Sequence, residues 1–408
     1  MRLSPAMPDY DRAVLYKPEA FEPLTEERWQ VGRVRDAIGM IVADADRAFD
    51  PVDLWPAHEW DSWRTPVPLK GLYVGAAGVI FALDLLRRRG LAETKIDLAP
   101  AASRALEAWR EAPEFMAEMQ LPTPAPAGLF SGESGILVVA WRLSGAGELA
   151  DALLTHVRQN AENPANEIMW GAPGTMLAAL AMLDWTGEER WADAWRESAD
   201  VLWARRQANG LWMQDLYGET FPELGPPHGV VGNALALLSA GDLLEPERRE
   251  ALMREIGAAL ARTAVVQDGL ANWPFAEGKP LPSGDGQIRV QWCAGAAGIV
   301  ASAASYLDEE LMLAGGELVW RAGPHGAEKG PCLCHGTAGN GYALLKVFER
   351  TGDERWLERA RRFAIHALGQ VERRNGRYSL WTGDVGVALY ASDCIEGRSR
   401  FPVLESWD

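Results

Sequence analysis

The stretch Gly171-Ala-Pro-Gly174-Thr-Met-Leu-Ala-Ala-Leu180 contains the pattern that decides the fold: a Gly-x-x-Gly pair followed at once by a small or apolar run. A single pair of this kind carries no information. The pattern occurs seven times in the 408 residues, at intervals of 39 to 66 residues, which indicates an internal repeat. The seven pairs are Gly75/Gly78, Gly132/Gly135, Gly171/Gly174, Gly229/Gly232, Gly295/Gly298, Gly336/Gly339 and Gly383/Gly386.

The runs that follow the glycine pairs are expected to be buried helices. They are rich in Ala and Leu and lack the alternation of a half-buried strand. They are apolar on most sides, which is typical of a helix buried on every face. Segments with one polar face lie between them, for example Glu188 to Arg206, Glu245 to Arg262 and Asp353 to Glu372. Each of these segments is expected to form an amphipathic outer helix.

Seven helical hairpins can bury their apolar helices together by closing into a ring. The sequence therefore predicts an all-α fold, an α/α toroid (barrel) of seven inner and seven outer helices. We expect residues 1–408 to form a single domain, although residues 1–65 carry no copy of the repeat. Every glycine pair then lies at the same end of the ring, where free N–H groups and helix dipoles make the surface electropositive. A functional site is expected at that end.

Composition excludes several classes of partner. The formal net charge of −17 repels phosphate backbones and anionic lipid, so we expect no nucleic-acid partner. No apolar run approaches the roughly 18 residues that span a bilayer, and no signal peptide is recognisable, so a cytoplasmic location is expected. Four cysteines are too few for a disulfide framework in a chain of this size, and their thiols should be reduced.

The fifth and sixth motifs carry residues that can bind a metal. Cys293 and Cys334 each lie two residues before the first glycine of their motifs, and His335 follows Cys334. In a toroid this shared register places both sulfurs at the same height on adjacent helix starts. Two thiolates and one imidazole suit Zn²⁺ and leave a fourth position open, so one zinc ion is predicted. The alternative is a pair of buried cysteines beside a loop histidine. Two further cysteines are interpreted as a bystander and a core thiol, Cys332 and Cys394 respectively.

Two more polar residues precede glycine pairs at the same end of the ring. His228 lies one residue before Gly229 and suits proton transfer near neutral pH, although it can equally be a helix-entry residue bonded to backbone. Glu167 lies four residues before Gly171, where a lone acid is more often a helix cap than a catalyst.

These residues resemble the lanthionine synthetase C family, including its eukaryotic glutathione-binding LanC-like members. The matching signatures are Trp292-Cys293-x-Gly295, Cys334-His335-Gly336, the repeated glycine pairs, and the C-terminal run Ser379 to Leu389 that closes with Arg400-Phe-Pro402. The resemblance extends from about residue 70 to the end of the chain. It implies the toroid and one zinc ion, and also a reaction, the addition of a thiol to a dehydroalanine or dehydrobutyrine side chain.

The resemblance also implies roles for individual residues. His228 becomes the acid and base that protonates the α-carbon after thiol addition. Arg289, four residues before Cys293, would stabilise the enolate oxygen. Trp292 and Glu167 fall on positions similar to residues of the family's active site.

Two basic residues resemble those that hold glutathione in the eukaryotic members. They are Lys329, five residues before Cys334, and Arg374, in the loop before the last motif, and either can instead be a surface charge. Ala294 departs from the family, many of whose members carry an aromatic residue or histidine there. The expected partners are a dehydrated peptide or protein substrate and glutathione.

Three functions remain open from the sequence. The first is an enzyme that adds a peptide cysteine or glutathione to a dehydroamino acid. The second is a non-catalytic protein that keeps the zinc and binds glutathione or a peptide. The third is a carbohydrate-active α/α barrel, which would need paired carboxylates across a cleft and would leave the two cysteines and histidine unexplained.

Overall fold

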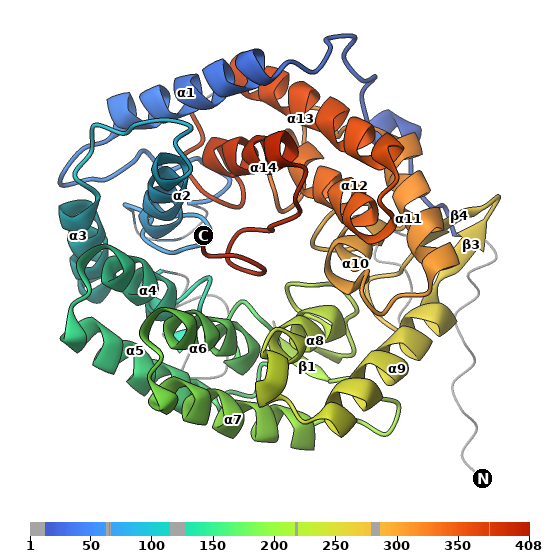
Figure 1. The fold of residues 1–408 in the computed structure, drawn as a ribbon, viewed down its shortest axis with the longest axis horizontal. Coiled ribbons are helices and arrows are strands. Elements are labelled where there is room, and N and C mark those ends of the chain that lie inside the picture. Colours follow the sequence, from blue (N-terminus) through green and yellow to red (C-terminus); the bar gives the residue numbers. More distant parts are fainter. Residues whose placement is uncertain are drawn as a thin grey trace.

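The computed structural model describes residues 13–62, 65, 67–114, 127–216, 219–278, 286–374 and 376–408. The described part of the chain contains fourteen α-helices arranged as two concentric rings, which confirms the predicted toroid (Figure 1). The inner helices are α2 (Ala76–Arg88), α4 (Glu133–Ser144), α6 (Ala172–Thr186), α8 (Val230–Leu238), α10 (Ala296–Ala303), α12 (Thr337–Thr351) and α14 (Asp384–Glu396). The outer helices are α1 (Val31–Ala48), α3 (Leu98–Glu111), α5 (Gly147–Asn160), α7 (Glu189–Ala204), α9 (Pro246–Thr263), α11 (Glu309–Ala322) and α13 (Glu354–Arg374).

The two rings differ in burial as their sequences predict. In α6 the eight residues from Ala172 to Ala179 are all buried, so the helix has no polar face. In α13 the buried side chains recur at helical spacing, for example Trp356, Ala360 and Phe363, and charged side chains occupy the other face. The hydrophobic effect therefore places the apolar helices in the inner ring and the amphipathic helices in the outer ring.

The second glycine of each pair allows the loop before it to fold back onto the helix. A Cβ at Gly174 would lie 2.0 Å from the carbonyl oxygen of Ile168, six residues earlier. A Cβ at Gly78 would lie 2.3 Å from the equivalent oxygen of Leu72 and 2.8 Å from the Cβ of Leu380 in the loop before α14. Because the seventh loop contacts the first in this way, the glycines also close the ring.

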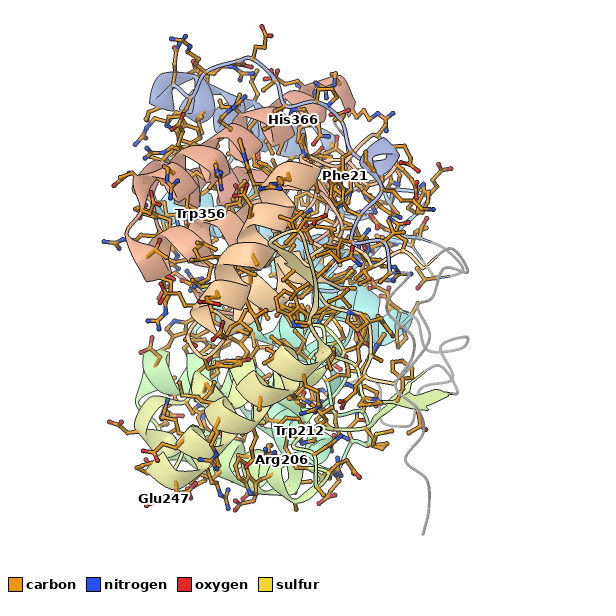
Figure 2. All side chains as sticks on the ribbon, turned by 90° about the vertical axis from the view of Figure 1, so that its right-hand side faces the viewer. Phe21, Arg206, Trp212, Glu247, Trp356 and His366 are labelled. Carbon is orange, nitrogen blue, oxygen red and sulfur yellow. The ribbon has the colours of Figure 1, made fainter. Side chains whose placement is uncertain are left out.

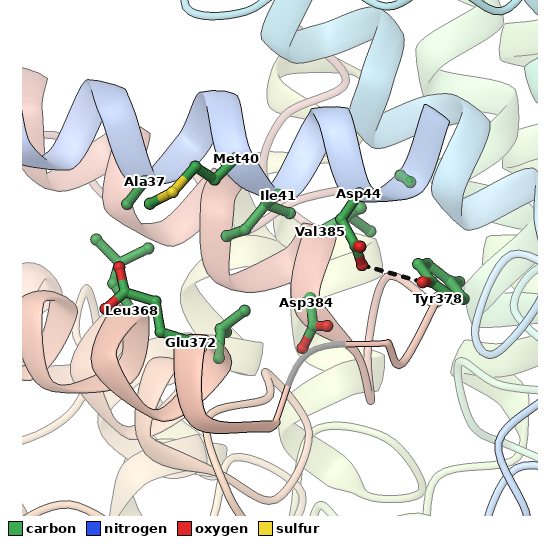
Figure 3. A pocket seen from close by; sticks show the side chains of 11 residues that line it. Ala37, Met40, Ile41, Asp44, Leu368, Glu372, Tyr378, Asp384 and Val385 are labelled. Atoms are coloured by element: carbon green, nitrogen blue, oxygen red, sulfur yellow. Dashed lines mark hydrogen bonds between the residues drawn. The ribbon is translucent and has the colours of Figure 1, made fainter. Parts of the chain in front are cut away.

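The first outer helix comes from the segment to which the sequence analysis assigned no element. No glycine pair precedes α1, yet it packs on α14 and α13 and completes the outer ring (Figure 1). Between the three helices lies an apolar cavity of about 190 Å³, beside which the Tyr378 hydroxyl donates to Asp44 Oδ2 at 3.0 Å (Figure 3). This cavity is separate from the ends of the inner helices that carry the cysteines.

Short strands occur in two of the loops that return to the inner ring, a departure from a purely helical chain. Strands β1 (Gln214–Leu216) and β2 (Glu219–Phe221) form one antiparallel hairpin, with Gln214 opposite Phe221. Strands β3 (Val265–Gln267) and β4 (Leu270–Asn272) form another, with Val265 opposite Asn272. Two 3₁₀ helices complete the described elements, η2 (Pro18–Ala20) and η4 (Gly241–Leu243).

The view turned by 90° shows the ring edge-on (Figure 2). The β1–β2 hairpin and Phe21 lie toward the same side of the molecule in that view. In the residues that the structure describes, no helix combines the length and the apolar character needed to cross a membrane.

Candidate functional site

The residue two positions before the first glycine occupies an equivalent place in neighbouring loops. The N–H of Cys293 donates to the carbonyl oxygen of Cys334 at 3.2 Å, and the N–H of Cys334 donates to that of Trp381 at 2.8 Å. The same ladder continues from Trp381 to Tyr73 at 3.2 Å and from Tyr73 to Phe130 at 3.0 Å. These bonds hold the two cysteines side by side, in the register that their spacing predicts.

Cys293, Cys334 and His335 form a group that could hold a metal ion. Their ligand atoms all lie within 4.8 Å of one another, and the Sγ of Cys293 is 3.2 Å from the Nδ1 of His335. Cys334 is buried, and the other two are half-buried, so the group faces a space that a small molecule can reach. Two sulfurs and an imidazole are the donor set of zinc sites that leave one position open.

The two thiols differ in proton affinity. A hydrogen bond from the Cys334 thiol is the largest effect on the pKa of Cys293. Burial opposes it, but this bond and the interaction with His335 outweigh burial and set that pKa well below its ordinary value. Burial is the main cause that raises the pKa of Cys334, and the hydrogen bond to Cys293 and the charge of Cys293 raise it further. A thiolate is therefore favoured at Cys293, and thiolates are the form that binds metal.

His228 and Glu167 form a second pair in the same region. The Nδ1 of His228 lies 2.8 Å from the Oε2 of Glu167, which is fully buried. Glu167 also accepts the backbone N–H groups of Met169 at 2.9 Å, Trp170 at 2.6 Å and Gly171 at 3.0 Å. Glu167 thus holds the turn that precedes α6 and orients the histidine as well.

The glutamate controls the charge of the histidine. Burial by itself lowers the pKa of His228, but the hydrogen bond and negative charge of Glu167 outweigh it and raise that pKa to about 9. The imidazole therefore carries a proton at neutral pH and can donate it.

One cavity of about 470 Å³ connects the metal-binding group with this pair. His228, Cys293, Cys334 and His335 all line it. A second cavity of about 550 Å³ shares three lining residues with the first: Arg289, Lys329 and His335. The metal-binding group therefore lies where two open spaces adjoin, which leaves room for two reactants.

The other residues singled out from the sequence lie in different surroundings. Arg289 and Lys329 line both cavities, and Lys329 Nζ also pairs with Glu328 at 3.0 Å. Trp292 is 1% exposed and packs on Trp381, with ring centroids 4.5 Å apart, so it supports the site from behind. Arg374 is exposed and lines neither cavity, but its Nη1 donates at 2.6 Å to the carbonyl oxygen of Ala327, which lines the 550 Å³ cavity.

Sequence reasoning missed three charged residues in the cavity wall. Arg377 and Asp61 both line the 470 Å³ cavity and pair with each other, through the arginine Nε at 2.8 Å and its Nη2 at 2.5 Å. Glu223 lines the same cavity and is 1% exposed. Arg377 and Glu223 lie six residues before the first glycine of their motifs, the same position as Arg289, so the repeat register contained the signal for these two.

Comparisons with known proteins agree with this geometry. Residues 66–405 match the family model described as lanthionine synthetase C-like protein. A protein of Danio rerio named glutathione S-transferase LANCL1 is 27% identical over 229 residues, or 52% of this chain. An Arabidopsis thaliana protein named LanC-like protein GCL1 is 35% identical over 151 residues, or 33% of this chain. The matched regions span 53% and 33% of those two relatives.

Among solved structures, nisin cyclase has a similar fold. The TM-score is 0.59 at 15% sequence identity, and the match covers 91% of this chain and 97% of that chain. At this identity the likeness shows a shared toroid and carries nothing about substrate. Because the family model covers most of the sequence, the chain belongs to the lanthionine synthetase C-like family.

Proposed function

We propose that this protein is a zinc-dependent enzyme that adds a thiol to the unsaturated side chain of dehydroalanine or dehydrobutyrine residues. The observation that carries the proposal is the presence of two reactive groups in one cavity. Cys293, Cys334 and His335 can hold the metal, and His228 with Glu167 can supply a proton. The printed name of one relative, a glutathione S-transferase, supports thiol chemistry.

A bound zinc ion would lower the pKa of an incoming thiol and so keep it nucleophilic at neutral pH. The addition forms a bond from sulfur to the β-carbon and breaks the π bond of the alkene. Its electron pair moves toward the α-carbon and the carbonyl oxygen. His228 then donates its proton to the α-carbon from Nε2, since Nδ1 is oriented by Glu167. The thiol releases its proton to solvent and His228 takes one up from solvent afterwards, so the addition balances and the imidazole returns to its protonated state.

Arg289, Lys329 and Arg377 bring positive charge to the cavity wall of a strongly acidic protein. Arg289 can stabilise the developing oxyanion. Lys329 and Arg377 can bind the carboxylates of glutathione or of a peptide. Arg374 remains a prediction as a glutathione-binding residue.

We also propose that residues 1–408 act as one domain in the cytoplasm. The four cysteines are free thiols, as a reducing compartment requires. In this setting a peptide cysteine would give a lanthionine ring and glutathione would give a thioether adduct. Dehydrated peptides and glutathione are therefore the proposed reactants.

Metal analysis and a product assay test the proposal together. The wild type should contain near-stoichiometric zinc, and Cys293→Ala should lose most of it. Cys394→Ala is the matched control, because Cys394 is a buried thiol at the far end of α14 and should leave the zinc content unchanged. Mass spectrometry then follows addition of glutathione to a dehydroalanine peptide. A zinc-loaded wild type that binds glutathione without forming product would favour the non-catalytic binding function.

A further inference from the structure

Glu223 is a buried acid in the wall of the 470 Å³ cavity that the mechanism above leaves unused. Its side chain is 1% exposed, and its Oε1 has no hydrogen-bond partner within the part of the chain that the structure describes. A buried polar atom without a partner costs free energy, because it has lost its hydrogen bonds to water without replacing them. The oxygen therefore marks a place where a ligand can form the missing bond.

The backbone around Glu223 is held firmly. The carbonyl oxygen of Glu223 accepts the N–H of Val230 at 2.9 Å, and the N–H of Leu224 donates to Phe275 at 3.0 Å. Because these bonds fix the backbone on both sides of Glu223, its side chain has a defined starting point at the cavity wall.

The repeat makes Glu223 the counterpart of Arg289 in the neighbouring loop. A Cβ at Gly229 would lie 2.5 Å from the Glu223 carbonyl oxygen, and one at Gly295 would lie 1.9 Å from that of Arg289. The two side chains thus start from matching points on the loops before α8 and α10, and both line the cavity. Glu223 and Arg289 therefore contribute an acidic and a basic side chain to the wall of the same cavity from neighbouring loops.

The surroundings of Glu223 favour its neutral form. Burial is the largest effect and, although His228 opposes it, the pKa of Glu223 rises to about 8, with Cys293 and Glu167 adding to the rise and Arg289 opposing it. A carboxyl group with this pKa is mostly protonated at pH 7. A neutral carboxylic acid has one O–H donor, whereas a carboxylate can only accept.

We propose that Glu223 is a substrate-contacting residue whose neutral carboxylic acid donates a hydrogen bond to the amide carbonyl oxygen of the dehydroamino acid. This inference rests on the proposed function. Negative charge develops on that oxygen as sulfur adds to the β-carbon, and Glu223 and Arg289 together stabilise it. Glu223 keeps its proton throughout, because the proton that reaches the α-carbon comes from His228.

Two substitutions separate a neutral donor from a carboxylate. Glu223→Gln retains an N–H donor of similar size, and Glu223→Leu removes the hydrogen bond. In steady-state addition of glutathione to a dehydroalanine peptide, Glu223→Gln should keep kcat within about threefold. Glu223→Leu should lose kcat by about 10²-fold, the usual loss for one such donor, with zinc content and glutathione affinity unchanged.

Glu114→Gln is the matched control. Glu114 is also 1% exposed, but it accepts the N–H groups of Lys70 and Gly71 and does not line either cavity. Its substitution should lower Tm without changing the KM for the peptide. Two results would overturn the inference. One is Glu223→Leu turning over like wild type, and the other is Glu223→Gln losing as much activity as Glu223→Leu.

An infrared measurement keeps the inference testable without turnover. The difference spectrum of wild type minus Glu223→Gln at pH 7 should show the C=O stretch of a protonated carboxyl. A carboxylate pair of bands in its place would contradict a neutral donor. If the wild type forms no product while this band is present, the proposed function fails and the neutral state of Glu223 stands.

Discussion

His228 and His366 each bind a glutamate at similar distance, and their proton affinities move in opposite directions. The pair at the cavity joins His228 Nδ1 to Glu167 at 2.8 Å, and the pair on the outer ring joins His366 Nε2 to Glu22 at 2.6 Å (His366 is labelled in Figure 2). The pKa of His228 is raised to about 9, whereas that of His366 is lowered, with burial as the largest cause.

The difference lies in the second contacts of each pair. Glu167 is fully buried, so solvent does not screen the attraction between its charge and His228. Glu22 is 30% exposed and also binds Arg373 at 3.1 Å. The Nδ1 of His366 accepts the N–H of Thr25 at 3.0 Å, a bond that protonation of the ring would break. Two similar histidine–glutamate pairs therefore give one cationic histidine and one neutral histidine.

Removing the two imidazoles should have the largest effect and the clearest contrast. His228→Ala should reduce kcat by about 10²- to 10⁴-fold, the usual contribution of a general acid, and leave zinc content near that of wild type. His366→Ala is the control, since His366 lies on the outer ring, and should change Tm with little effect on kcat. Equal turnover in His228→Ala and wild type would remove His228 from the mechanism.

Replacing Glu167 and Glu22 should have a smaller effect, and again only the change beside the cavity should alter turnover. Glu167→Gln keeps a hydrogen bond to His228 but removes the charge that raises its pKa. The alkaline limb of kcat/KM, expected near pH 9 in wild type, should move to lower pH, with a loss of about 10-fold at pH 8. Glu22→Gln should leave the profile in place. An unchanged alkaline limb in Glu167→Gln would show that Glu167 does not set the pKa.

Stability should respond to pH with opposite signs in the two pairs. The folded pKa of His228 lies above its ordinary 6.5, so its stabilisation is complete below pH 6.5 and is lost as pH rises through about 9. The folded pKa of His366 lies below 6.5, so its contribution is present above pH 6.5 and decreases at lower pH. Relative to wild type, the Tm deficit of His228→Gln should shrink between pH 6 and 10. That of His366→Gln should shrink on acidification, and parallel curves would contradict both assignments.

The fold was predictable because the glycine pairs are required by close contacts that no other residue permits. At Gly339 an added Cβ would lie 1.7 Å from the carbonyl oxygen of Leu333, so the pattern persists in the sequence wherever a loop folds onto an inner helix. The same register predicted Cys293 and Cys334 as neighbours. Helix α1 escaped prediction because no glycine pair precedes it and its position depends on packing against α13 and α14.

The site was predictable only as far as the register was followed. Positions one and two before the first glycine hold His228, His335 and the two cysteines. The position six before it holds three further residues that line the cavity, Glu223, Arg289 and Arg377. The resemblance indicated Glu167 as a site residue, but its bond to His228 was not predicted, because Glu167 lies four residues before its glycine pair and outside the register that aligns His228 with the cysteines.

The smallest predicted effect concerns Arg373, which distinguishes the outer pair from the inner one. Its side chain is 58% exposed, so solvent and salt screen its influence. Arg373→Ala should produce a small rise in the pKa of His366, because Glu22 then interacts with the imidazole without a competing cation. Titration by NMR should detect this rise at low ionic strength and a smaller one at about 1 M salt. If the pKa of His366 does not move at low salt, burial and the Thr25 bond alone keep the ring neutral, and the contrast with His228 comes from geometry rather than from the neighbouring charge.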